Sequence, residues 1–239
     1  MDFLNHLEKL IYDMYDSTNS ETKQGSATEL ANWLVEATGD QIVECAIAFL
    51  NSNKRECILF FAANSLKQCI RTKWNQLTQQ ILSQLVTFFS QYIINHQTSI
   101  SQPSYVFIII CLTDIAILAG ESFPFPQVLS DFPINIQMTA CSYYFDEFNS
   151  GFFKGHFSQD PIVAPQHIIE YAHHILQNTP LSLEWLKFYH NFTYSLIEYE
   201  SILIYVPVLQ EAATILDLCD VLSSHIKMII KFDMHNGPD

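Results

Sequence analysis

Residues 53–77 read NKRECILFFAANSLKQCIRTKWNQL, and they show the pattern on which the rest of the chain is organised. Apolar residues recur at intervals of three and four, which is the spacing of one face of an α-helix. This face comprises Ile58, Phe61, Ala62, Leu66, Cys69 and Ile70. The polar residues on the opposite side are Asn64, Lys67, Gln68 and Arg71. The stretch therefore predicts one amphipathic helix with a core face and a polar face that can meet a partner.

The overall composition favours an all-helical fold. The chain has 239 residues, of which 49% are hydrophobic and 15% are charged, and only 6 are glycine. Long apolar stretches with few turn residues are typical of helices, whereas sandwiches and barrels need turns between many short strands. The length allows one or two domains and is sufficient to bury a substantial core.

The net charge of −14 is unevenly distributed. Seven basic and ten acidic residues give −3 for residues 1–73, while four basic and fifteen acidic residues give −11 from residue 74 onward. Such a surface repels phosphate backbones, so we do not expect direct nucleic-acid binding. An acidic surface suits a basic protein partner, although the same charge also serves solubility.

The N-terminal sequence and the spacing of the cysteines are typical of a protein in a reducing compartment. Residues 1–16 lack the basic start and continuous apolar block of a secretory signal. The six cysteines form no C-x-x-C pair and lie in apolar helical patterns, so free and mostly buried thiols are expected.

The most apolar run, residues 105–119, reads YVFIIICLTDIAILA and contains Asp114. It is shorter than the roughly 18–20 residues that a membrane span requires, and an acidic residue inside a span is costly. We therefore predict a helix that is buried within the protein and no membrane insertion.

The first half of the chain reads as three helical pairs. The expected helices cover residues 2–15, 21–38, 40–50, 54–72, 76–96 and 104–119, with Gly39 as the stop of the second and Asp40 as the cap of the third. Each pair is about 35 to 45 residues long, which is the range of HEAT-type repeats. The expected fold is all-α, a right-handed α-solenoid of stacked HEAT-like helical hairpins.

The second half of the chain, residues 121–239, is expected to continue the same solenoid less regularly. Three prolines between residues 123 and 133 interrupt helix formation, leaving room for one short turn at 127–129. Residues 149–164 read as a loop, and helices are expected at 134–148, 165–177, 181–199 and 205–231. Residues 1–120 therefore form the regular N-terminal unit in this reading.

No motif in the chain indicates catalysis, a metal site or a cofactor. His167, His173 and His174 lie close together in sequence, but no acid or cysteine joins them at ligand spacing. A glycine-rich phosphate loop and a nucleophile motif are also missing from the sequence. We therefore do not expect an enzyme.

Residues 1–77 resemble the N-terminal module of the importin-β-like nuclear transport receptors, or karyopherins, and within them the branch of the SR-protein transportin. The resemblance rests on Leu10 to Tyr15, Ala27 with Leu30 and Trp33, Phe49-Leu50, and Phe61-Ala62-Ala63-Asn64-Ser65-Leu66-Lys67 up to Ile70 and Trp74. The chain departs from the family at Lys23, Gln24 and Gly25, where an arginine is common, and at Cys69, where a basic residue is common. Family members also have many more repeats.

The resemblance implies binding of the small GTPase Ran in its GTP form by the second helices of the first hairpins. The residues expected to contact Ran are Lys23, Glu29, Asn64, Lys67, Gln68, Arg71 and Asp114, with Arg71 as the anchor. The resemblance also implies protein cargo, including basic cargo, contact with nucleoporins, and a location in cytoplasm and nucleus. The alternative is a truncated or divergent helical-repeat scaffold for protein–protein interaction that does not bind Ran.

Overall fold

The computed structural model describes residues 2–52, 54–99, 102–149, 165–180 and 182–198. Residues 150–164 of the predicted loop and the helix predicted at 205–231 lie outside this range. The described residues form helices and connecting turns, and none of them lies in a β-strand. The prediction of an all-α fold is therefore confirmed for this part of the chain.

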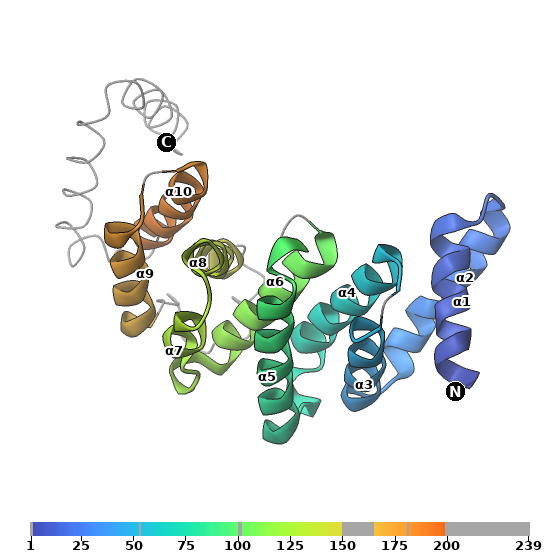
Figure 1. The fold of residues 1–239 in the computed structure, drawn as a ribbon. Coiled ribbons are helices and arrows are strands. Elements are labelled where there is room, and N and C mark those ends of the chain that lie inside the picture. The colour runs from blue at the N-terminus through green and yellow to red at the C-terminus, as the bar shows by residue number, and fades with distance from the viewer. Residues whose placement is uncertain (1, 53, 100–101, 150–164, 181, 199–239) are drawn as a thin grey trace, which may run out of the picture.

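Ten α-helices follow one another in the described residues (Figure 1). Their bounds are α1 Asp2–Asp16, α2 Ser20–Glu36, α3 Gly39–Leu50, α4 Glu56–Thr72, α5 Gln79–Asn95, α6 Pro103–Ala119, α7 Phe125–Ser130, α8 Ile134–Asn149, α9 Gln166–Asn178 and α10 Leu183–Glu198. Short 3₁₀ turns occur at Trp74–Gln76, Gln97–Ser99 and Gly120–Ser122. The proline-rich segment thus holds the six-residue helix α7, slightly more than the single turn that was expected.

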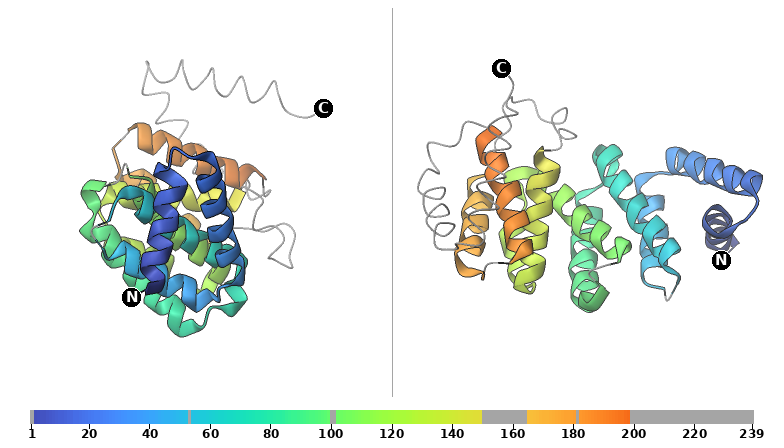
Figure 2. Two further views of the ribbon diagram at one scale, coloured as in Figure 1. Left: turned by 90° about the vertical axis from the view of Figure 1, so that its right-hand side faces the viewer. Right: turned by 90° about the horizontal axis from the view of Figure 1, so that it is seen from above.

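The helices form one row, with α1 and α2 at one end and α9 and α10 at the other (Figures 1 and 2). Helices α4, α6, α8 and α10 pack on one another in turn and make the spine of this row. Helices α3 and α5 pack against α4 and α6 from one side. Helix α1 packs against both α2 and α4, and so connects the first pair to the spine. This helical row positions every residue of the candidate site.

Side-chain caps decide where several of these helices begin. Asn19 Oδ1 accepts hydrogen bonds from the backbone N–H groups of Glu21 and Thr22 at the start of α2, at 2.8 and 3.3 Å. Thr38 and Gln41 form a reciprocal capping box at the start of α3. The prediction that Asp40 caps this helix is therefore wrong. The cap is Thr38, whose hydroxyl accepts a hydrogen bond from the backbone N–H of Gln41.

Gly39 begins α3 rather than ending α2, whose last residue is Glu36. A Cβ at position 39 would lie 2.9 Å from Leu77 Cδ2, so the small residue permits a close approach between α3 and the segment after α4. Its role is steric, which the sequence pattern does not reveal.

Helix α6 is the core helix that the apolar run predicts. Tyr105, Ile109 and Ile115 are among its buried residues, and α4, α5 and α8 cover it. The helical segment Pro103–Ser122 has 20 residues and a mean hydropathy of 1.9, so by length and composition alone it could cross a membrane. The expectation that it is too short was wrong, but 67% of its apolar window is buried inside the protein, as expected for a core helix.

The five cysteines in the described part of the chain are free thiols, as predicted. Cys69, Cys111 and Cys141 are buried, while Cys45 and Cys57 are half-buried. Burial raises the pKa of Cys69 to about 11 and also raises the pKa values of Cys111 and Cys141. The three buried thiols are therefore poor nucleophiles.

Replacing Gly25 with alanine should stabilise the protein by about 0.5–1 kcal/mol, because glycine in a helix interior costs that much relative to alanine. Gly25 lies inside α2, and a Cβ there would meet no atom within 4 Å. The matched variant Gly39→Ala should be less stable than Gly25→Ala, because Leu77 has to move. Thermal unfolding followed by circular dichroism measures both, and an equal gain at Gly39 would contradict the steric role of that position.

Candidate functional site

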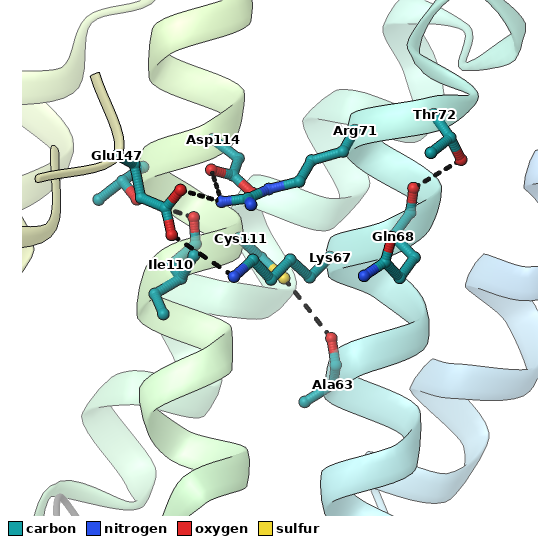
Figure 3. A network of polar contacts seen from close by, with 10 residues as sticks. Ala63, Lys67, Gln68, Arg71, Thr72, Ile110, Cys111, Asp114 and Glu147 are labelled. Atoms are coloured by element: carbon teal, nitrogen blue, oxygen red, sulfur yellow. Dashed lines mark hydrogen bonds and ion pairs between the residues drawn. The ribbon is translucent and has the colours of Figure 1, made fainter. Parts of the chain in front are cut away.

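The structure divides the seven residues expected to contact Ran into two groups. Lys23 and Glu29 lie exposed on α2, and Gln68 is exposed on α4, with Asn64 half-buried on the same helix. Glu29 Oε1 lies 2.8 Å from Nε2 of His6 on α1. The other three residues, Lys67, Arg71 and Asp114, belong to a network between helices (Figure 3). The side chains of this second group are exposed by 15% for Lys67, 10% for Arg71 and 0% for Asp114.

A charged cluster of four side chains joins α4, α6 and α8. Arg71 Nε and Nη2 donate to the two carboxylate oxygens of Asp114 on α6, at 2.6 and 2.9 Å. Arg71 Nη2 also lies 2.5 Å from Glu147 Oε2 on α8. Lys67 Nζ donates to the other oxygen of Glu147 at 3.4 Å. The guanidinium group of Arg71 on α4 thus binds both α6 and α8. We call Lys67, Arg71, Asp114 and Glu147 the charged cluster (Figure 3).

The charged cluster is largely withdrawn from water. The exposed fraction of the side chain is 0% for Asp114 and 10% for Arg71. Asp114 is therefore inaccessible to a partner in this arrangement of the helices, which disfavours its predicted contact with Ran. The role of Arg71 as an anchor is disfavoured too, because its guanidinium group binds two carboxylates of its own chain. Helical spacing alone could not distinguish these two outcomes.

Burial raises the pKa of Asp114 to about 6, even though the hydrogen bonds and the charge of Arg71 lower it. Glu147 adds a smaller repulsion in the same direction as burial. At neutral pH the cluster holds two cations and two anions, so its charges balance. The balance still requires an ionised carboxylate in a site withdrawn from solvent, which is costly.

The stability of the protein should depend on pH through Asp114. Its folded-state pKa of about 6 lies above its ordinary value of 3.8, so the folded protein holds this proton more tightly than the unfolded chain. That contribution is fully present below about pH 4 and is lost as the pH rises through about 6. The free energy of unfolding of the wild type relative to Asp114→Asn should therefore fall by about 2.5 kcal/mol between about pH 4 and pH 7.

Urea denaturation of both proteins across this pH range measures the effect. Asp131 is exposed and lies at the end of α7, so Asp131→Asn is the control. The same pH dependence in both comparisons, or a relative stability of the wild type that rises with pH, would contradict the raised pKa.

Aromatic contacts extend the charged cluster toward the protein surface. Lys67 Nζ lies 5.0 Å from the ring centroid of Phe107 on α6, within reach of a cation–π interaction. The Phe107 ring meets Phe60 of α4 edge to face at 5.1 Å. Both rings are only half-buried. This face of α4 and α6 is therefore aromatic as well as polar, which the charge pattern of α4 did not indicate.

Two carboxylates that the sequence reading missed have defined roles. Glu147 completes the charged cluster from 76 positions after Arg71. Glu56 accepts hydrogen bonds from the backbone N–H and the hydroxyl of Ser104 at 2.9 and 3.0 Å, and so caps α6 from α4. No local pattern connects either residue with its partner, because each contact crosses between helices.

The histidines of α9 do not form a common site. His167 and His173 are half-buried on α9, and His174 is exposed and lies against Asn178. Within the described ranges no three His, Cys, Asp or Glu side chains are grouped so that they could hold a metal ion. A hollow runs along α2, lined by Ser20, Glu21, Gln24, Gly25, Thr28, Glu29 and Asn32. Because one helix lines it, it is open and does not enclose a substrate.

In the described part of the chain, α4 and α6 thus present a surface that is both polar and aromatic. In comparisons with known proteins, no family model, no curated protein and no solved structure matches the chain.

Proposed function

We propose that this chain is the N-terminal arch of a nuclear transport receptor that binds Ran in its GTP form. In this proposal the helical row is a right-handed α-solenoid of HEAT-like hairpins, with residues 1–120 as the Ran-binding repeats and residues 121–239 as their continuation. The receptor carries protein cargo, including basic cargo suited to the net charge of −14, passes nucleoporins, and is found in cytoplasm and nucleus.

Helix α4 is the observation that supports this proposal. It carries the strongest resemblance to karyopherins, lies in the spine of the row, and keeps Gln68 exposed and Asn64 half-buried. Stacked helical repeats commonly bind partners with an extended surface of successive helices. With Lys67, Arg71 and Asp114 engaged in the charged cluster, the proposed Ran contacts are Lys23, Glu29, Asn64 and Gln68.

The second candidate is a helical-repeat scaffold that does not bind Ran. The burial of Arg71 and Asp114 favours it, because buried arginine anchors commonly carry affinity at interfaces and this arginine is engaged within the chain. A scaffold needs only the surface of the helical row and requires no dependence on a nucleotide.

A pull-down separates the two candidates. The full chain should retain Ran loaded with a non-hydrolysable GTP analogue and not Ran loaded with GDP. The variant Lys23→Glu/Gln68→Glu should weaken retention about fivefold or more, since a contributing interface residue is worth more than about 1 kcal/mol. Lys187→Glu on α10 is the control, because this lysine is also exposed but lies far along the row.

Equal retention of both nucleotide forms, or retention of neither, would exclude the transport proposal and leave the scaffold. Retention of the GTP form that is unchanged in the double variant would preserve the transport proposal and exclude the assigned contacts.

A further inference from the structure

We propose that the charged cluster is a conformational lock, which selects one register and orientation of α4, α6 and α8 and so holds the helical row in one shape. The proposal does not depend on which partner the protein binds. It concerns a role that charge in a protein interior can have besides stability, namely the choice among alternative packings.

Helix α6 needs such a lock because its surface is apolar nearly all round. Residues 108–117 are buried without interruption, so apolar side chains face the neighbouring helices in every direction. Turning α6 by one residue would rotate it by about 100° and still present apolar groups to α4 and α8. Apolar packing of this kind defines a core well but discriminates weakly between similar arrangements.

Asp114 is the charged residue of α6, and it faces Arg71 and Glu147 at the contact of the three helices. Moving α6 by one residue along its axis displaces Asp114 by about 1.5 Å, besides rotating it away. The contacts of 2.6 and 2.9 Å to Arg71 could not survive this displacement, and an ionised carboxylate would lose its partner. Other registers of α6 are therefore penalised.

A second polar contact holds the opposite end of α6. Glu56 in the first turn of α4 binds the backbone N–H and hydroxyl of Ser104 in the first turn of α6. Arg71 in the last turn of α4 binds Asp114 near the end of α6. The two contacts connect equivalent ends, so α4 and α6 run parallel and are fixed at both ends. The charged cluster extends this constraint to α8, through Glu147.

The lock makes a prediction that separates it from an ordinary stabilising contact. The double variant Arg71→Met/Asp114→Leu removes the central pair together, leaves Lys67 beside Glu147, and fills the site with apolar groups. Buried ion pairs replaced in this way commonly leave stability unchanged or increased. We expect the urea midpoint to stay at or above that of the wild type, while the row samples more than one shape.

Electron–electron distance measurements between two spin labels report the shape directly. The labels are placed on exposed positions by Glu44→Cys on α3 and Glu170→Cys on α9, on either side of the charged cluster. Cys45, Cys57 and Cys219 are replaced by serine in all samples, and the buried thiols of Cys69, Cys111 and Cys141 remain. The wild-type background should give one narrow distance distribution and the double variant a broad or multiple one.

Two further variants keep the test decisive. Arg71→Lys retains the charge but cannot bind Asp114 and Glu147 with one rigid fork, so it should also broaden the distribution. Arg55→Met/Asp16→Asn removes an exposed ion pair and should leave it narrow. A narrow distribution in both cluster variants would overturn the proposal. Loss of folding in the double variant would overturn it as well, because the cluster would then be a stabiliser and not a lock.

Discussion

Replacing Arg71 with methionine should lower the free energy of unfolding by about 3–5 kcal/mol, the cost typical of breaking a buried ion pair from one side. The variant leaves Asp114, which is 0% exposed, without its two hydrogen-bond donors. The carboxyl group must then either stay ionised without a partner or take up a proton, and each choice costs free energy. Urea denaturation followed by circular dichroism measures the loss.

The control for this prediction is Arg55→Met. Arg55 also binds an aspartate, Asp16, at 2.8 Å, but its side chain is 70% exposed. An exposed ion pair is worth about 0.2–1 kcal/mol, so the control should lose no more than that. A similar loss in both variants would mean that water reaches Asp114 as readily as it reaches Asp16, contrary to the burial that the structure assigns.

Replacing Phe145 with alanine should cost about 3–5 kcal/mol, the range for removing a fully buried phenylalanine side chain. The ring centroid of Phe145 on α8 lies 6.4 Å from that of Phe188 and 5.1 Å from that of Phe192, both on α10. All three side chains are 0% exposed. The substitution therefore opens a cavity between α8 and α10 and removes the aromatic contacts that join the last pair to the row.

The position of the damage is also predictable. In stacked helices each unit is stabilised by its neighbours, so the loss should concentrate at α9 and α10. Amide hydrogen exchange should show protection lost in these helices before it is lost in α4. The control Phe3→Ala removes a ring that is 49% exposed, and it should have a small effect confined to the first pair. Uniform loss of protection along the whole chain would contradict this account.

Local sequence patterns predicted the helices well because each pattern is read within a few turns. The spacing of apolar residues at 53–77 predicted α4, and the composition predicted an all-helical chain. The boundary between α2 and α3 was less predictable. The sequence suggested Gly39 as the end of α2 and Asp40 as the cap of α3. In the structure the hydroxyl of Thr38 caps α3, and Gly39 allows the close approach of Leu77.

The candidate site was only partly predictable, since a polar residue on a helix faces either solvent or another helix. Gln68 and Arg71 share one side of α4, yet Gln68 is exposed and Arg71 is 10% exposed. What separates them is the position of Asp114 and Glu147, on helices that follow much later in the chain. No property of residues 53–77 carries that information.

The sequence by itself determined that the described part of this chain forms helices around an apolar core, because that outcome depends on periodicity and composition. Only the tertiary structure decided which polar residues of the quoted stretch remain available to a partner. It directed Arg71 and Lys67 inward to two acidic residues and left Gln68 at the surface. The physical reason is that a charge becomes structural when stacking excludes water and supplies an opposite charge, and both conditions arise only when distant helices meet.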